Sequence, residues 1–78
     1  MSNNTNFADY IANALADGIY GDTPEGDFIE DASNDSEQNV MRSIHSWDEL
    51  KFYLEDKNAC DGAIEAAGYV WNDYMNTK

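Results

Sequence analysis

The sequence predicts an all-α protein, a compact bundle of four to five short helices, and three observations support this. Apolar residues recur every three or four positions in several separate stretches, which is the period of one helix face. No stretch alternates apolar and polar residues long enough for a strand, and β-branched residues are few. With 78 residues, the chain forms one small core. We expect a single helical domain over residues 6–76, after a disordered tail over residues 1–5.

The first helix is predicted over residues 6–17. Five apolar residues share one helical face there: Phe7, Tyr10, Ile11, Ala14 and Leu15. Thr5 or Asn6 is expected to cap its start, because a short polar side chain can accept a hydrogen bond from a free backbone N–H. Gly18 and Gly21 are expected to end it, because glycine adopts the left-handed conformation at little cost.

The second helix is predicted from Pro24 to about Ser33. Thr23 is the expected cap, and proline fits the first helical position, where no backbone N–H is needed. The apolar side of this helix is short and consists of Phe28, Ile29 and Ala32. Residues 34–36 (Asn-Asp-Ser) are typical of a turn that follows it.

A third apolar segment, with Val40, Met41 and Ile44, is either a short helix or a stretch laid over the core. Ser46 and Glu49 then form a capping box, in which each side chain bonds a backbone N–H near the other. The helix that follows carries apolar residues at helical spacing: Trp47, Leu50, Tyr53 and Leu54.

The last helix is expected to start at Asn58. One face would consist of Ile64, Ala67, Trp71 and Met75, with Tyr74 beside them. The opposite face, with Glu65, Asn72 and Asp73, is expected to face water.

The order and spacing of the short motifs are similar to those of a known family. The motifs are Phe7-x-x-Tyr10-Ile11, Phe28-Ile29-Glu30-Asp31-Ala32-x-x-Asp35, and Tyr53-Leu54-Glu55 followed by Trp71-x-x-Tyr74. Together they resemble the YozE-type SAM-like (sterile-alpha-motif-like) family of short bacterial and phage proteins. The resemblance implies a compact SAM-like helical bundle, and it implies no activity.

The charge is strongly negative and unevenly distributed. The net charge is −12; residues 1–41 hold nine carboxylates and no Lys or Arg, whereas residues 42–78 hold seven carboxylates and four bases. Such a surface repels nucleic acid and anionic membranes and attracts basic protein surfaces, including those that hold nucleic acid. We therefore expect no direct binding to nucleic acid or to membranes.

The acidic segment 22–37 is the predicted partner-binding face. Its carboxylates are Asp22, Glu25, Asp27, Glu30, Asp31, Asp35 and Glu37. Asp27, Asp31 and Asp35 recur every four residues, so on one helix they would form a ladder whose charge density comes within a few-fold of that of DNA. The alternative is an ordinary solvated acidic face that keeps the protein soluble.

We expect no enzymatic activity, no metal and no cofactor. The segment 56–62 superficially resembles a calcium-binding EF-hand loop, but its register puts Lys57 where the first Asp should lie. Cys60 and His45 lack a spacing that would make a nucleophile and its base, and are interpreted as a small packing residue and a helix-entry residue. Trp47 and Trp71 are expected in the core, and so short a chain has little room for a pocket of enzyme size.

Two functions follow from this sequence. The first is a small acidic interaction protein, encoded by a phage or mobile element, that mimics nucleic acid and inhibits a DNA- or RNA-binding or defence protein such as a restriction or CRISPR effector. The second is an accessory structural domain acting through an apolar patch, with Tyr20, Phe52 and Tyr69, or through homodimerisation. The polar N-terminus and the lack of a long apolar run indicate the cytoplasm of a bacterial host cell, as a monomer or weak homodimer.

Overall fold

The computed structural model describes residues 6–77, apart from the side chains of residues 35 and 36. Within this part of the chain it contains five α-helices and no strand, which confirms the predicted all-α class. The helices are α1 (Phe7–Asp17), α2 (Pro24–Ala32), α3 (Asp35–Ser43), α4 (Trp47–Asp56) and α5 (Asp61–Asn76). The predicted tail over residues 1–5, including the possible cap Thr5, lies outside the described residues.

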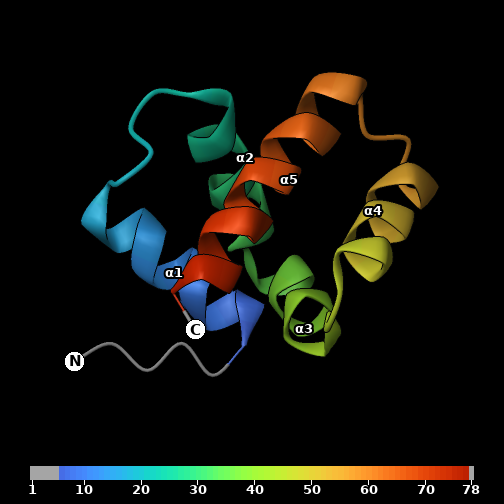
Figure 1. Cartoon of the computed structure of the whole chain (residues 1–78), viewed down its shortest axis with the longest axis horizontal. Coiled ribbons are helices and arrows are strands. Elements are labelled where there is room, and N and C mark those ends of the chain that lie inside the picture. The colour runs from blue at the N-terminus through green and yellow to red at the C-terminus, as the bar shows by residue number, and fades with distance from the viewer. Residues whose placement is uncertain (1–5, 78) are drawn as a thin grey trace.

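The longest helix, α5, organises the bundle. It packs against α2, α4 and α1, while α3 packs against α1 and α2 (Figure 1). The described chain is compact, with principal extents of 35 × 26 × 24 Å. As a result, α2 is supported by α1, α3 and α5, and its acidic side remains free to face solvent.

Helix α1 begins and ends as predicted. The side chain of Asn6 accepts a hydrogen bond from the backbone N–H of Asp9 at 2.9 Å, and Gly18 ends the helix with a φ of 65°. Leu15 departs from the prediction, because it is 39% exposed. The buried face centres on Phe7, Ile11 and Ala14, and Leu15 lies at its edge.

The turn between α2 and α3 is shorter than predicted. Thr23 caps α2 as expected, accepting a hydrogen bond from Gly26 N at 3.1 Å. The prediction that residues 34–36 form a turn is wrong, because Asn34 is the N-cap of α3 and accepts a hydrogen bond from Glu37 N at 3.2 Å. Asn, Asp and Ser favour turns and helix starts alike, so composition alone did not separate the two.

The capping box at α4 is present with one change. Ser46 Oγ accepts from Glu49 N at 3.2 Å, and Glu49 Oε1 accepts from the backbone N–H of His45 at 2.6 Å. The return bond therefore reaches one residue earlier than in the usual motif, in which it would reach the cap residue itself. His45 is a helix-entry residue, as predicted, because it directly precedes the cap and its backbone N–H makes this bond.

The predicted start of α5 at Asn58 is wrong. Asn58 has a φ of 62°, the left-handed conformation that ends α4. Its N–H bonds Glu55 O at 3.0 Å, and the N–H of Ala59 bonds Leu54 O at 2.9 Å, which is the Schellman pattern. Helix α5 begins only at Asp61, after Cys60, whose side chain makes no cap bond.

The buried face of α5 is rotated relative to the predicted one. It consists of Ala66, Ala67, Val70, Trp71 and Tyr74. Met75, predicted to be buried, is 47% exposed, and Asp73, predicted to face water, is partly buried. The rotation follows the aromatic core, in which Phe7 of α1 lies 4.9 Å from Trp71 and 5.3 Å from Tyr74 between ring centroids.

The two tryptophans differ in burial. Trp71 is 8% exposed and belongs to the core, as predicted. Trp47 is only half-buried, and it packs at the edge of the core over Gly68 of α5, where an added Cβ would lie 3.5 Å from its ring. A Cβ at position 68 would therefore make only ordinary van der Waals contact with this ring.

Candidate functional site

The acidic residues of α2 and of the turn before it are largely open to solvent. Asp22, Asp27, Glu30 and Asp31 are exposed, and Glu25 is half-buried. The opposite face of α2 supplies Phe28, Ile29 and Ala32 to the core. One short helix thus anchors itself with apolar residues and presents carboxylates on its other side.

The predicted ladder of three carboxylates on one helix is wrong. Asp27 and Asp31 lie one turn apart on α2, but α2 ends at Ala32 and Asp35 opens α3. The side chain of Asp35 is outside the described part of the chain. The continuous array on α2 consists of Asp27, Glu30 and Asp31, which share one face at i, i+3 and i+4.

Glu37 differs from the other predicted face residues because it is engaged by a base. Its Oε1 accepts hydrogen bonds from Lys57 Nζ at 2.5 Å and from Tyr53 Oη. The Lys57 ammonium, and then the Tyr53 hydroxyl, hold the pKa of this carboxyl below its usual range. Glu37 is therefore neutralised within the protein rather than offered to a partner. Its two donors lie 16 and 20 residues away, too far for a sequence pattern to have identified them.

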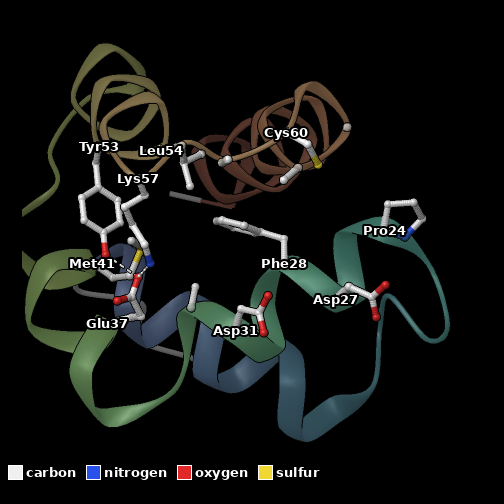
Figure 2. Close-up of a pocket in the computed structure, with 14 residues that line it drawn as sticks. Pro24, Asp27, Phe28, Asp31, Glu37, Met41, Tyr53, Leu54, Lys57 and Cys60 are labelled. Carbon is white, nitrogen blue, oxygen red and sulfur yellow. Dashed lines mark hydrogen bonds and ion pairs between the residues drawn. The ribbon is translucent and has the colours of Figure 1, made fainter.

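A pocket of about 450 Å³ opens between α2, α3 and the α4–α5 connection (Figure 2). Its residues are Pro24, Asp27, Phe28, Asp31, Ala32, Glu37, Met41, Tyr53, Leu54, Lys57, Ala59, Cys60, Gly62 and Ala63. This volume is within the range of small-ligand sites, so the expectation that so short a chain has little room for a pocket is wrong. Helix periodicity could not reveal it, since the pocket depends on how α2, α3, α4 and α5 meet.

Apolar and charged groups are segregated in this pocket. Phe28, Met41 and Leu54 are all buried and form its floor, whereas Asp27 and Asp31 are exposed on the α2 side. Figure 2 shows Lys57 and Tyr53 turned towards Glu37, away from those two carboxylates. The pocket is thus an apolar depression with two unneutralised negative charges along one side.

Cys60 also lies at this pocket, and its prediction as a packing residue is wrong. The thiol is free and exposed, because the residue precedes α5 as its cap rather than facing the core.

A second polar cluster joins α1 and α5 through Tyr20. Its hydroxyl lies 2.8 Å from the hydroxyl of Tyr10 and donates to Asp73 Oδ2 at 2.8 Å. Burial, followed by these two hydrogen bonds, raises the pKa of Tyr20 above its usual range. Tyr20 is therefore a structural residue, and it is not available for the apolar patch that the sequence suggested.

Several apolar residues remain exposed elsewhere. Phe52 is 72% exposed on α4, while Ile19 and Tyr69 are 58% and 57% exposed beside a shallow depression that Tyr20 and Asp73 also line. Of the predicted apolar patch, Phe52 and Tyr69 are thus exposed, and Ile19 is an additional residue that sequence reasoning missed.

Among residues 6–77, no three His, Cys, Asp or Glu side chains are grouped so that they could hold a metal ion. In the same part of the chain, every helix is too short or too polar to cross a membrane.

The fold and the site define a small all-helical domain with an acidic helix beside an apolar pocket. Comparisons of the chain with protein-family models, with curated proteins and with solved structures found no match. The resemblance to the YozE-type SAM-like family therefore stays a prediction.

Proposed function

We propose that this protein is a non-enzymatic interaction domain whose carboxylate-rich face, centred on α2, docks on a basic protein surface. In its specific form it is a nucleic-acid mimic from a phage or mobile element. It acts in the cytoplasm of a bacterial host and occupies the nucleic-acid site of a DNA- or RNA-binding or defence protein of the restriction or CRISPR type.

One observation supports this proposal above others: within the described residues, the exposed carboxylates of α2 form no ion pair. Asp27, Glu30 and Asp31 form no ion pair with any Lys or Arg of the described residues. These three carboxylates lie along about 6 Å of the helix axis, so their number per length of axis is close to that of one nucleic-acid strand, which has one phosphate per roughly 3.4 Å of axis. A basic groove that holds phosphates can accept such a face.

Charge-neutral variants test the proposal with the fold intact. The triple variant Asp27→Asn, Glu30→Gln, Asp31→Asn is compared with a control of equal net charge, Asp17→Asn, Asp48→Asn, Glu65→Gln, whose residues are also exposed. Each immobilised protein is incubated with host lysate at low and at high salt, and the retained proteins are identified. We expect basic proteins to be retained by the wild type and the control, lost from the α2 variant, and released by salt or by added DNA. Retention that is unchanged by salt, or lost equally in both variants, contradicts the mimicry.

A second function is favoured by the exposed apolar residues. Ile19 and Tyr69, near Tyr20, could contact a second copy or an accessory partner, as a structural domain would require. The double variant Ile19→Ser, Tyr69→Ser separates the two functions. A change in the sedimentation coefficient of this variant, with lysate binding unaffected, supports the structural function.

A further inference from the structure

The floor of the pocket beside α2 is apolar, although the protein as a whole is strongly acidic. Phe28, Met41 and Leu54 are 7%, 1% and 7% exposed, so each is mostly buried and shows the pocket only a small part of its surface. Ala32 and Ala63 complete the floor with small side chains that leave room above them. The volume of about 450 Å³ accommodates a large apolar side chain from another molecule.

The rim of the pocket, formed by Asp27 and Asp31, favours a positively charged molecule. Asp27 and Asp31 are exposed at the pocket, and no described base pairs with either. Lys57 is the only base among the lining residues, and Glu37 already neutralises it. Phosphate groups and acidic peptides are therefore repelled. A second copy of this chain is disfavoured as the occupant of the pocket for the same reason, because its own net charge is −12.

We propose that the pocket binds a large apolar side chain of a basic protein segment, and that Lys or Arg residues flanking this side chain pair with Asp27 and Asp31. The inference rests on the proposed function and narrows it, because it assigns one anchoring contact within the acidic face. Charge steers the encounter, and the apolar anchor distinguishes the correct segment from any other basic surface.

Three fluorescein-labelled peptides test the inference on the unmodified protein by fluorescence anisotropy. One has a Trp flanked by two Arg residues on each side, the second has Ala in place of the Trp, and the third has Glu in place of every Arg. We expect the Trp–Arg peptide to bind about tenfold more tightly than the Ala–Arg peptide, because only the indole ring is large enough to fill the pocket and pack on its apolar floor. The Trp–Glu peptide should show no measurable binding, because its charges face Asp27 and Asp31.

Cys60 allows the pocket to be blocked without a mutation. It is the only cysteine of the chain, its thiol is exposed, and it lies at the pocket, so a bulky maleimide can be attached there alone. Alkylation should reduce the affinity for the Trp–Arg peptide to that for the Ala–Arg peptide and leave the latter unchanged. Circular dichroism before and after alkylation verifies that the helices persist.

The rim is tested with matched charge variants. The double variant Asp27→Asn, Asp31→Asn should lower the affinity for the Trp–Arg peptide at least about fivefold more than the double variant Asp17→Asn, Glu65→Gln does. The second variant removes the same charge elsewhere. Equal losses in the two pairs overturn the role of the rim. Two results would overturn binding of the apolar side chain in the pocket. One is that the Trp–Arg and Ala–Arg peptides bind with affinities within about twofold of each other, and the other is that the Trp–Arg peptide does not bind.

The two proposals fail separately. If both Arg peptides bind alike and salt releases both, the pocket is not used, but the acidic face still docks on basic partners. If the lysate experiment shows no salt-sensitive partner, the proposed function fails whatever the peptides show.

Discussion

Glu37 Oε1 accepts hydrogen bonds from both Lys57 Nζ and Tyr53 Oη, and this arrangement ties α3 to the end of α4. It also divides the acidic segment into two parts. Glu37 is satisfied inside the protein, whereas the carboxylates of α2 are not. Glu37 is therefore not expected to contribute to binding, whereas the carboxylates of α2 are.

Replacing Glu37 by Gln tests this division through stability. Because its pKa is lowered in the folded state, chiefly by Lys57, the carboxylate stabilises the fold above its unfolded pKa of about 4.3, and that contribution is lost as the pH falls through the lower folded pKa. At neutral pH we expect Glu37→Gln to lower the free energy of unfolding by about 0.5–1 kcal/mol, since Lys57 is partly exposed and solvent screens the pair.

Urea denaturation at neutral and at acidic pH measures the effect. The difference from the wild type should shrink below about pH 4. Glu30→Gln is the control, because Glu30 is exposed and forms no ion pair with the described bases. A difference that persists unchanged at acidic pH would contradict the assigned role of Glu37.

The hydroxyl of Tyr20 is expected to stabilise the contact between α1 and α5. Tyr20→Phe removes a donor to Asp73 and a partner of Tyr10, and should cost about 1 kcal/mol of unfolding free energy. Burial raises the folded pKa of Tyr20, so its contribution is complete below the unfolded pKa of about 10 and is lost as the pH rises beyond it.

Alkaline titrations of both proteins, followed by circular dichroism, measure this dependence. The wild type should lose stability above about pH 10 more steeply than Tyr20→Phe. Parallel curves for the two proteins would show that the hydroxyl does not couple folding to pH.

Gly26 is required for the chain to turn into α2. A Cβ added at this position would lie 2.2 Å from the carbonyl oxygen of Gly21, so the loop before α2 would have to move. We expect Gly26→Ala to destabilise the protein by more than about 2 kcal/mol, through a steric clash that its better helix propensity cannot offset.

Gly62 provides the matched control on another helix. Nothing lies within 4 Å of a Cβ added there, and the residue is in the first turn of α5. Gly62→Ala should therefore leave stability unchanged or raise it by up to about 1 kcal/mol. Thermal unfolding measures both variants, and equal melting temperatures would contradict the clash at Gly26.

Local signals in the sequence predicted most of the helix boundaries. Thr23, Ser46 and Gly18 each act within three or four residues, through bonds that depend on neighbours along the chain. Asn58 was misjudged because Asn favours both helix starts and left-handed helix ends. Only the Schellman bonds to α4 decide between the two.

The candidate site was predictable only in part. The acidic composition of α2 was evident, but its pocket and the neutralisation of Glu37 depend on contacts between elements distant in sequence. The rotation of α5 has the same origin, because aromatic packing on Phe7 decides which of its residues are buried. Periodicity alone does not decide which neighbouring residues at the edge of such a face are buried.

Asp31 is expected to destabilise the helix that presents it. It lies in the last turn of α2, which contains no basic residue, and the negative end of the helix dipole disfavours a carboxylate there. Asp27 lies in the first turn, where the dipole favours it. Asp27→Asn relieves the repulsion of Asp27 with both Glu30 and Asp31, whereas Asp31→Asn relieves only its repulsion with Asp27, so a larger gain for Asp31→Asn points to the dipole.

We expect Asp31→Asn to raise the free energy of unfolding by about 0.3–1 kcal/mol and Asp27→Asn to leave it nearly unchanged. Urea denaturation at low salt measures both, and the gain should diminish at high salt because the interaction is screened. Stabilisation by Asp31→Asn together with weaker binding of basic partners would mean that the carboxylate serves recognition at the expense of stability. If Asp31→Asn leaves the free energy of unfolding unchanged or lowers it, recognition and stability do not conflict at this position. Asp31 is then explained as part of an ordinary solvated acidic face.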